Sequence, residues 1–232
     1  MHALTVVKLG GSYAGSSHLT NWLGALVACA GHVVVVPGGG PFADTVRATQ
    51  RRMGFDDGTA HRMALLAMEQ YGLALVALAR DIAPTGAKAP PRGAKVVPAD
   101  SAAAIRRALR DSSVPVWLPT RMALAADNVP CSWNVTSDSL AAWLARRLGA
   151  RHVLLVKQTR PPAACLDANE LAAQGLVDPL FAAFLAGSGA QGGLAGPDDY
   201  AQAAAAIRSG AAFGSRIDWT RTAPPSDANF RI

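Results

Sequence analysis

Apolar and polar residues follow two different periods along this chain, and their order predicts strands that alternate with helices. Short apolar runs rich in β-branched residues are typical of buried strands, and apolar positions three and four residues apart are typical of amphipathic helices. Strands are expected at 3–9, 33–36, 73–79, 114–118 and 152–156, and helices at 19–30, 57–71, 102–109, 137–148, 179–186 and 200–207. This alternation predicts an α/β fold, a three-layer αβα sandwich with a mainly parallel central sheet.

Turn-forming and capping residues separate these elements. Asp57 or Thr59 and then Ser137 are the expected N-caps of two helices, and Pro41 suits the first turn of another. Three segments lack both periods and are expected to be loops: 81–95, 119–134 and 187–196. The first strand, the first helix and the second strand together form a βαβ unit. We therefore expect the two strands to be parallel, with a right-handed crossover.

Length and composition limit the class of protein. The chain has 232 residues, half of them apolar and 16% charged, which suits a globular domain that needs no disulfide or metal for stability. No apolar run approaches the roughly 20 residues of a membrane-spanning helix, and no signal-peptide pattern occurs near Met1. A cytoplasmic protein with no membrane partner is expected. Cys29, Cys131 and Cys165 are widely spaced, so we expect reduced thiols in or near the core.

Positive charge is concentrated in the first two thirds of the chain. The formal net charge is +6; residues 1–150 carry 15 Lys+Arg and 9 Asp+Glu, whereas residues 151–232 carry 7 of each. A basic surface fits a nucleic acid, a membrane surface or an anionic small molecule. No aromatic residues interleave with the arginine pairs, as a stacking platform for nucleic acid would require. We therefore expect no nucleic-acid partner and favour an anionic small molecule.

Two glycine clusters follow neighbouring strands of the expected sheet. Residues 10–12 (Gly-Gly-Ser) end the first strand, and residues 38–40 (Gly-Gly-Gly) end the second. Parallel sheets bind ligands at these carboxyl ends, where glycine amides and helix N-termini can hold phosphate. Lys8 would place an ammonium group beside the same oxygens. Each cluster alone is better explained as a tight turn, but two clusters on adjacent strand ends favour an anion site.

Other phosphate, catalytic and metal signatures are absent or lie in the wrong context. No Gly-Lys pair occurs, which excludes a P-loop. The GxGxxG match at 187–192 follows a helical segment rather than a strand, so a flexible loop is expected there. The five histidines show no metal-ligand spacing, and the chain itself is expected to hold no metal.

A third segment, residues 132–139, reads Ser-Trp-Asn-Val-Thr-Ser-Asp-Ser. Asp138 would lie in the first turn of a helix, where the helix dipole stabilises a carboxylate. Taken alone, this is ordinary capping. Together with Lys8 and the two glycine clusters, it fits a site that handles phosphate.

These three motifs, in this order, resemble the amino acid kinase superfamily. The motifs are KLGGS at residues 8–12, GGGP at residues 38–41 and TSDSLAAWLA at residues 136–145, and the resemblance spans about residues 3–216. The superfamily includes acetylglutamate, aspartate and uridylate kinases. Within it, residues 60–72 and the SWNVTSDS segment are similar to the small kinases of methanofuran-type cofactor biosynthesis. Those kinases phosphorylate an aminomethylfuran-methanol phosphate to its diphosphate.

The resemblance implies an ATP-dependent kinase in one-carbon cofactor biosynthesis, with Mg²⁺ carried by ATP. It implies a small phosphorylated or carboxylated acceptor, a homo-oligomer and one amino acid kinase-like domain over residues 1–232. Residues 1–150 would bind the acceptor, residues 151–220 the nucleotide, and residues 221–232 would form a tail. The residues implied to be catalytic are Lys8 and Asp138. Those implied to bind the nucleotide phosphates are Gly10, Gly11, Ser12 and Lys157. Those implied to bind the acceptor are Gly38, Gly39, Gly40, His61 and Asn134.

Two segments depart from the family pattern. Relatives commonly read K-x-V-D-G after the strand at 152–156, whereas here Lys157 and Gln158 are followed by Thr-Arg-Pro. Relatives often place a lysine after a late glycine pair, and none follows Gly192 and Gly193. Two alternatives therefore stay open: a non-catalytic relative that binds a nucleotide or oxyanion, and a kinase for another acceptor such as isopentenyl phosphate, an amino acid or UMP. For His61, the alternative is an exposed helix residue.

Overall fold

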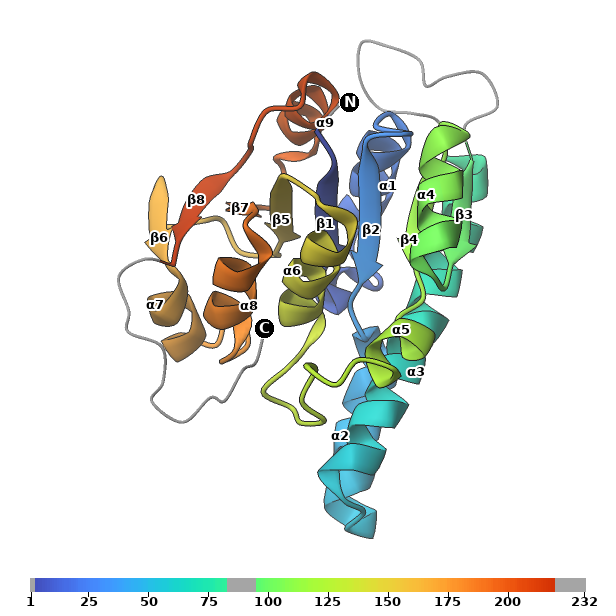
Figure 1. Cartoon of the computed structure of the whole chain (residues 1–232), viewed down its shortest axis with the longest axis vertical. Helices are drawn as coiled ribbons and strands as arrows, with labels where there is room; N and C mark the ends of the chain where they lie inside the picture. Colours follow the sequence, from blue (N-terminus) through green and yellow to red (C-terminus); the bar gives the residue numbers. More distant parts are fainter. Residues whose placement is uncertain (1–2, 83–94, 220–232) are drawn as a thin grey trace.

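A computed structural model of the chain describes residues 3–82 and 95–219, and Figure 1 shows how its elements are layered. These residues form one eight-stranded sheet in the order β3-β4-β2-β1-β5-β7-β8-β6. The strands are β1 (Thr5–Leu9), β2 (Val33–Pro37), β3 (Val96–Ala99), β4 (Val114–Trp117), β5 (His152–Val156), β6 (Cys165–Asp167), β7 (Gln191–Ala195) and β8 (Ser215–Asp218). Neighbouring strands in it are parallel, apart from the antiparallel pair β7 and β8. The predicted α/β fold with a mainly parallel sheet is confirmed.

Helices cover both faces of this sheet. The helices and short 3₁₀ turns are η1 (Gly11–Tyr13), α1 (His18–Val27), α2 (Gly40–Met53), α3 (Asp57–Leu78), η2 (Ala79–Asp81), α4 (Ala102–Arg110), α5 (Thr120–Leu124), α6 (Ser137–Leu148), α7 (Ala168–Ala173), α8 (Phe181–Ser188) and α9 (Tyr200–Ser209). Helix α1 packs against α9, and α6 packs against α8. Figure 1 shows α2 and the first part of α3 extending side by side below the sheet.

The core lies in two layers, one on each face of the sheet. Val6 of β1 and Leu155 of β5 belong to a buried cluster with residues of α6 and α8. Their neighbours Val7 and Leu154 belong to a second buried cluster with residues of α1 and α9. Successive strand residues point to opposite faces. A strand covered on both faces is therefore apolar throughout, which explains the continuous apolar runs in the sequence.

Helix α3 is longer than the sequence pattern predicts. The expected strand at 73–79 is wrong, because α3 continues to Leu78 and η2 follows it. Gly72 does not end the helix; a Cβ atom there would lie 3.2 Å from the Pro37 side chain and 3.4 Å from that of Val116. The missing side chain lets the helix lie close to β2 and β4. Beyond this contact the helical period continues, with Leu75 buried and Leu73 exposed.

Strand β7 lies in the segment that was expected to be a glycine-rich loop, and that prediction is wrong. A Cβ atom on Gly192 would lie 2.7 Å from the Leu185 side chain, and one on Gly193 would lie 2.1 Å from the carbonyl oxygen of Phe213. Glycine in a strand is typical of such close approaches. The expected flexible loop at 187–192 is likewise wrong, because these residues end α8 and begin β7.

Several short elements have no recognisable period in the sequence. Strands β3, β6 and β8 contain four, three and four residues, and α5 and α7 contain five and six. Such lengths cover barely two turns of a helix or two repeats of a strand. Most of the expected loop at 81–95 and the expected tail at 221–232 lie outside the described residues.

The residues that cap α3 and α6 precede the expected ones. Asp56, rather than Asp57 or Thr59, caps α3, because its carboxylate accepts a hydrogen bond from the backbone N–H of Thr59 at 2.7 Å. Thr136, rather than Ser137, caps α6. In both helices the preceding residue has the extended backbone typical of an N-cap. The first turn of α2 does contain the proline, as expected.

The cysteines lie in different environments. Cys29 is buried, as expected, but Cys131 and Cys165 are exposed, so the prediction of thiols in or near the core is wrong for those two. Both follow or lie in short irregular segments that carry little core. Separately, none of the helices described here is long and apolar enough to cross a membrane.

Replacing Gly193 with alanine is expected to lower the free energy of unfolding by about 1–3 kcal/mol, since a Cβ atom would collide with the backbone of Phe213. Gly187→Ala is the matched control. Gly187 lies inside α8 with only the Arg146 side chain nearby, at 3.8 Å. Alanine there is expected to stabilise the chain by up to about 1 kcal/mol. Urea unfolding followed by circular dichroism measures both; an unchanged midpoint for Gly193→Ala would contradict the packing of β7.

Candidate active site

The carboxyl ends of three central strands lie side by side. Leu9 at the end of β1 pairs with Pro37 of β2 on one side and with Val156 of β5 on the other. The segments that follow these strands therefore leave the sheet at one edge. Helix α6, with Asp138 in its first turn, packs against β1 and β5 at the same place. The parallel register thus brings together the three segments that the sequence singled out.

The two glycine clusters contact each other through their backbones. A Cβ atom on Gly11 would lie 2.1 Å from the amide nitrogen of Gly40, and one on Gly38 would lie 2.3 Å from the amide nitrogen of Gly11. Gly40 also has a φ of 56°, in the left-handed region that favours glycine. Glycine is therefore required here for packing, whether or not a ligand is bound. The predicted role in phosphate binding stays a prediction.

A cavity of about 610 Å³ opens at this edge of the sheet. Most of the predicted site residues line it: Lys8, Gly11, Ser12, Gly38, Gly39, Gly40, His61, Asp138 and Lys157. Gly10 and Asn134 are not among the lining residues. Gly10 precedes η1 as its N-cap residue. Asn134 is exposed, whereas both of its neighbours in the chain line the cavity.

One carboxylate is shared by two lysines at the strand-end side of this cavity. The Nζ atom of Lys8 lies 3.0 Å from Oδ1 of Asp138, and the Nζ atom of Lys157 lies 2.8 Å from Oδ2. The three side chains are only 8%, 6% and 15% exposed for Lys8, Asp138 and Lys157. Within this cluster two cations face one anion, so each ammonium group keeps part of its charge for an anionic ligand.

Burial and charge shift the protonation equilibria of this cluster. Burial alone would raise the pKa of Asp138, but Lys8 and Lys157 outweigh it and hold that pKa below its ordinary value. Burial, followed by the charge of Lys8, lowers the pKa of Lys157 to about 8, and Asp138 opposes this shift. The ammonium group of Lys157 is therefore mostly charged at neutral pH but loses its proton far more readily than an ordinary lysine.

Two further hydrogen bonds fasten Lys157 to the segment after β1. The Tyr13 hydroxyl donates to the backbone carbonyl of Lys157 at 2.8 Å. The Gln158 side-chain amide donates to the backbone carbonyl of Ser12 at 3.1 Å. These bonds join segments about 145 residues apart in sequence and fix the backbone on which the Lys157 side chain is carried.

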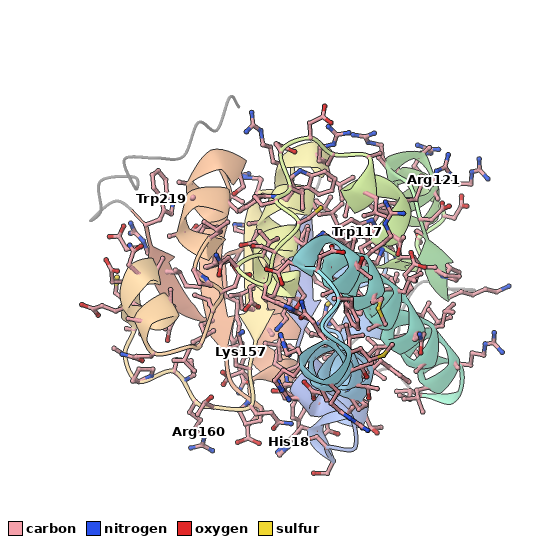
Figure 2. The ribbon with its side chains drawn as sticks, turned by 90° about the horizontal axis from the view of Figure 1, so that it is seen from below. His18, Trp117, Arg121, Lys157, Arg160 and Trp219 are labelled. Carbon is pink, nitrogen blue, oxygen red and sulfur yellow. The ribbon has the colours of Figure 1, made fainter. Side chains whose placement is uncertain are left out.

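Figure 2 shows Lys157 at this end of the molecule, with Arg160 and His18 nearer its margin. Both of these residues reach Asp198: the Arg160 guanidinium lies 2.8 Å and the His18 ring 3.3 Å from its carboxylate. Arg160 is 80% exposed. Exposed ion pairs of this kind contribute little to stability. In this region we therefore assign more weight to the buried pair Lys8 and Lys157 than to the exposed ion pairs of Asp198.

A model of the amino acid kinase family matches residues 3–160. The chain belongs to the amino acid kinase family. Among curated proteins, it is similar to the (5-(aminomethyl)furan-3-yl)methyl phosphate kinase of Methanocaldococcus jannaschii, with 24% identity over 123 residues. That alignment covers 53% of this chain and 50% of the relative, so the matched region spans about half the length of the curated protein.

Solved structures of two kinases share the fold of this amino acid kinase family member. The uridylate kinase from Archaeoglobus fulgidus superposes with a TM-score of 0.61 at 18% identity, over 94% of this chain and 100% of that one. The UMP kinase from Ureaplasma parvum superposes with a TM-score of 0.65 at 14% identity, over 94% and 98%. At these identities the likeness establishes the fold alone, and it confirms the expected amino acid kinase-like architecture.

The cavity of this family member also has residues that the sequence analysis missed. Arg47 of α2 lies over the ring of Trp133, with 4.5 Å between the guanidinium carbon and the ring centroid. The Trp133 indole N–H donates to Gln50 at 2.7 Å. Both Arg47 and Trp133 line the cavity, as does Asp178. Trp133 stands next to a predicted residue, but no local pattern shows that an irregular segment folds back onto α2.

His61 is buried rather than exposed. It lies on α3 beside the cavity with 5% exposure, so the alternative of an exposed helix residue is wrong. Burial lowers its pKa, and a hydrogen bond with the backbone of Ser132 opposes the shift. The ring is therefore neutral at pH 7. No group of three or more His, Cys, Asp or Glu side chains that could hold a metal occurs within residues 3–82 and 95–219.

Lys157 is expected to titrate near pH 8 in the folded chain. In Asp138→Asn, burial and the charge of Lys8 still disfavour the Lys157 ammonium, but its carboxylate partner is gone. The titration midpoint of Lys157 should therefore fall further. Carbon-13 NMR of the lysine Cε atoms measures this, because the chain has only four lysines. Lys157→Arg identifies the signal by removing it.

The same shift predicts a dependence of stability on pH. Between about pH 8 and 10.5 the unfolded chain binds more protons at Lys157 than the folded chain does, so this group makes the folded state more stable as pH rises. Urea unfolding of the parent and Lys157→Met over this range isolates the contribution. A Cε midpoint near 10.5 in the folded parent would contradict both expectations.

Proposed function

We propose that this chain transfers the terminal phosphoryl group of ATP to a small anionic acceptor. The observation that carries the proposal is a pair of buried ammonium groups that both bind the Asp138 carboxylate. They lie beside a cavity that is also lined by the two glycine turns. Phosphoryl transfer needs little covalent chemistry from a protein; it needs two substrates in line and cancellation of their negative charge. Lys8 and Lys157 supply that charge, and Asp138 holds both ammonium groups in place.

The hydrogen-bond donors at this edge of the sheet suit a nucleoside triphosphate. We assign Gly10, Gly11, Ser12 and Lys157 to the nucleotide phosphates, with Lys8 between the two substrates. ATP would supply the phosphoryl group, and Mg²⁺ carried by ATP would neutralise part of the charge on the phosphate oxygens. In the transfer, an acceptor oxygen forms a bond to the terminal phosphorus while the bond to the ADP oxygen breaks. Apart from the turn at residues 10–12, residues 1–150 would then serve the acceptor and residues 151–220 the nucleotide.

The acceptor would occupy the part of the cavity nearest α2 and α3. Gly38, Gly39, Gly40 and His61 line this part, and exposed Asn134 lies beside it. Leu65, Met68 and Val135 also line the cavity, which suits an acceptor with a compact unsaturated body. We propose aminomethylfuran-methanol phosphate as the acceptor and its diphosphate as the product. The similarity to the curated kinase supports this choice, and the positive charge of residues 1–150 favours a phosphorylated acceptor.

An acceptor panel tests the proposal. With Mg-ATP, we expect ADP and a diphosphate product from aminomethylfuran-methanol phosphate, and a lower kcat/KM with UMP, isopentenyl phosphate or acetylglutamate. Phosphorus-31 NMR identifies the product, and a coupled assay measures ADP. Formation of no ADP with any phosphomonoester would overturn the proposal. Calorimetric binding of ATP without turnover would support the alternative of a non-catalytic nucleotide-binding protein.

Lys8→Ala is expected to lower kcat by about 100-fold to 1,000-fold, because a fixed charge at the transferring phosphoryl group is lost. Arg121→Ala is the matched control: it also removes a cation paired with an aspartate, but Arg121 is 70% exposed and does not line the cavity. The control should keep full activity. Circular dichroism and thermal melts confirm that both variants fold. Undiminished activity of Lys8→Ala would show that the transfer site lies elsewhere.

A further inference from the structure

A second buried carboxylate, Asp178, lies near the lysine cluster and has no role in the proposal above. It belongs to the segment between α7 and α8, is 5% exposed and lines the cavity. Among the described residues it forms no ion pair with a lysine or arginine. A buried carboxylate without a cation must receive hydrogen bonds to offset its lost hydration.

Asp178 receives five hydrogen bonds, four of them from the start of α6. Its Oδ2 atom accepts from the backbone N–H and the hydroxyl of Thr136, both at 2.9 Å, and from the backbone N–H of Ser139 at 3.0 Å. Its Oδ1 atom accepts from the Ser139 hydroxyl and from the backbone N–H of Leu180 at 3.2 Å. The carboxylate therefore binds Thr136 and Ser139, the residues on both sides of the Ser137–Asp138 pair.

These bonds extend to the backbone of Asp138 itself. The Asp138 N–H points to the Thr136 hydroxyl oxygen at 3.4 Å, and that hydroxyl in turn donates to Asp178. The first N–H groups of a helix have no partner within the helix and are usually capped by a side chain close in sequence. Here the N–H of Ser139 is capped by a carboxylate 39 residues away. A local cap would stabilise the helix, but a distant one also fixes where the helix begins.

We propose that Asp178 is a positioning residue: it holds the first turn of α6 so that the Asp138 carboxylate stays between Lys8 and Lys157. This inference rests on the proposed function, because it assigns Asp178 to the same phosphoryl-transfer site. The required placement is tight, since Asp138 meets one ammonium group at 3.0 Å and the other at 2.8 Å. A shift of about 1 Å in a catalytic group can reduce a rate by about 100-fold.

The chemistry of the site distinguishes a carboxylate from an amide. Burial, followed by the negative charge of Asp138, raises the pKa of Asp178, while the donors on Ser139 and Thr136 oppose the shift. An asparagine would keep one carbonyl oxygen for the donors on Thr136. Its NH₂ group, however, would face the Leu180 N–H, where two donors meet and no hydrogen bond can form. Asp178→Asn therefore weakens the hydrogen bonding of residue 178 while preserving the volume of its side chain.

The kinetic test compares Asp178→Asn with Asp167→Asn. Asp167 caps α7, accepting from the backbone N–H groups of Asn169 and Glu170 at 2.8 and 3.1 Å, and it does not line the cavity. Both variants should lower the melting temperature. We expect only Asp178→Asn to lower kcat, by about tenfold or more, with both KM values within about twofold of the parent. A rise in KM alone, with kcat unchanged, would overturn the proposal.

A second readout does not depend on turnover. The groups around the Lys157 ammonium are Lys8, which lowers its pKa, and Asp138, which raises it, while the Tyr13 hydroxyl contacts only the Lys157 carbonyl. If Asp178 places Asp138, Asp178→Asn should move the Cε titration midpoint of Lys157 below that of the parent. Because Asp178→Asn also removes a negative charge, which by itself lowers this midpoint, Thr136→Val is tested beside it: it keeps the charge and removes only the hydroxyl contacts to Asp178 and to the Asp138 N–H. A merely structural cap would leave the midpoint of Thr136→Val unchanged, as Asp167→Asn should.

The two readouts separate failure of this inference from failure of the proposed function. If the parent chain forms no ADP with any acceptor, the proposed function fails, and the Lys157 titration still decides whether Asp178 places Asp138. If Asp178→Asn does not fold, Thr136→Val removes one hydrogen bond to Asp178 and the contact to the Asp138 N–H, and should shift the midpoint in the same direction. A midpoint that stays unchanged or rises in the folded variant overturns the inference.

Discussion

Two ammonium groups lie buried side by side in this protein, and a single carboxylate between them makes this possible. Removing a cation from water costs several kcal/mol, and Lys8 and Lys157 also repel each other. Asp138 offsets both effects only if it meets each ammonium group at hydrogen-bond distance. That condition requires β1 and β5 to end at the same level and α6 to begin beside them. The parallel register and the packing of α6 satisfy it.

The glycine clusters help to meet the same requirement. The turns after β1 and β2 must leave the sheet without covering the carboxylate, and they do so by passing within backbone contact of each other at Gly11, Gly38 and Gly40. Close backbone passage and phosphate binding both call for glycine, because both need the space that a side chain would fill. The sequence pattern alone therefore cannot separate the two roles. The structure shows the close backbone passage, and phosphate binding stays a prediction.

The central elements could be predicted because their signals are local. β1, β2 and β5 are buried on both faces and read as apolar runs. Lys8 and Lys157 stand at the carboxyl ends of β1 and β5, and Asp138 stands in the first turn of α6. β7 could not be predicted, because its glycines match contacts made elsewhere in the chain: Gly192 lies against Leu185, and Gly193 against Phe213, twenty residues later. The same holds for Asp178, because four of its five hydrogen-bond donors belong to residues about 40 positions earlier. Features created by contacts distant in sequence leave no periodic signal.

Charge in this chain has a long-range effect, the attraction of anions by the net charge, and a short-range effect at the buried site. Only the short-range effect depends on whether the cation is a lysine or an arginine. The +6 net charge comes mostly from arginines, which draw anions from a distance whatever their detailed placement. The buried site uses lysines instead. An ammonium is a compact charge that fits beside one carboxylate oxygen, and burial can bring its pKa to about 8, as at Lys157; a guanidinium stays charged and presents a broad planar fork. Two of only four lysines therefore form the buried cluster with Asp138, a place that the surface arginines do not fit.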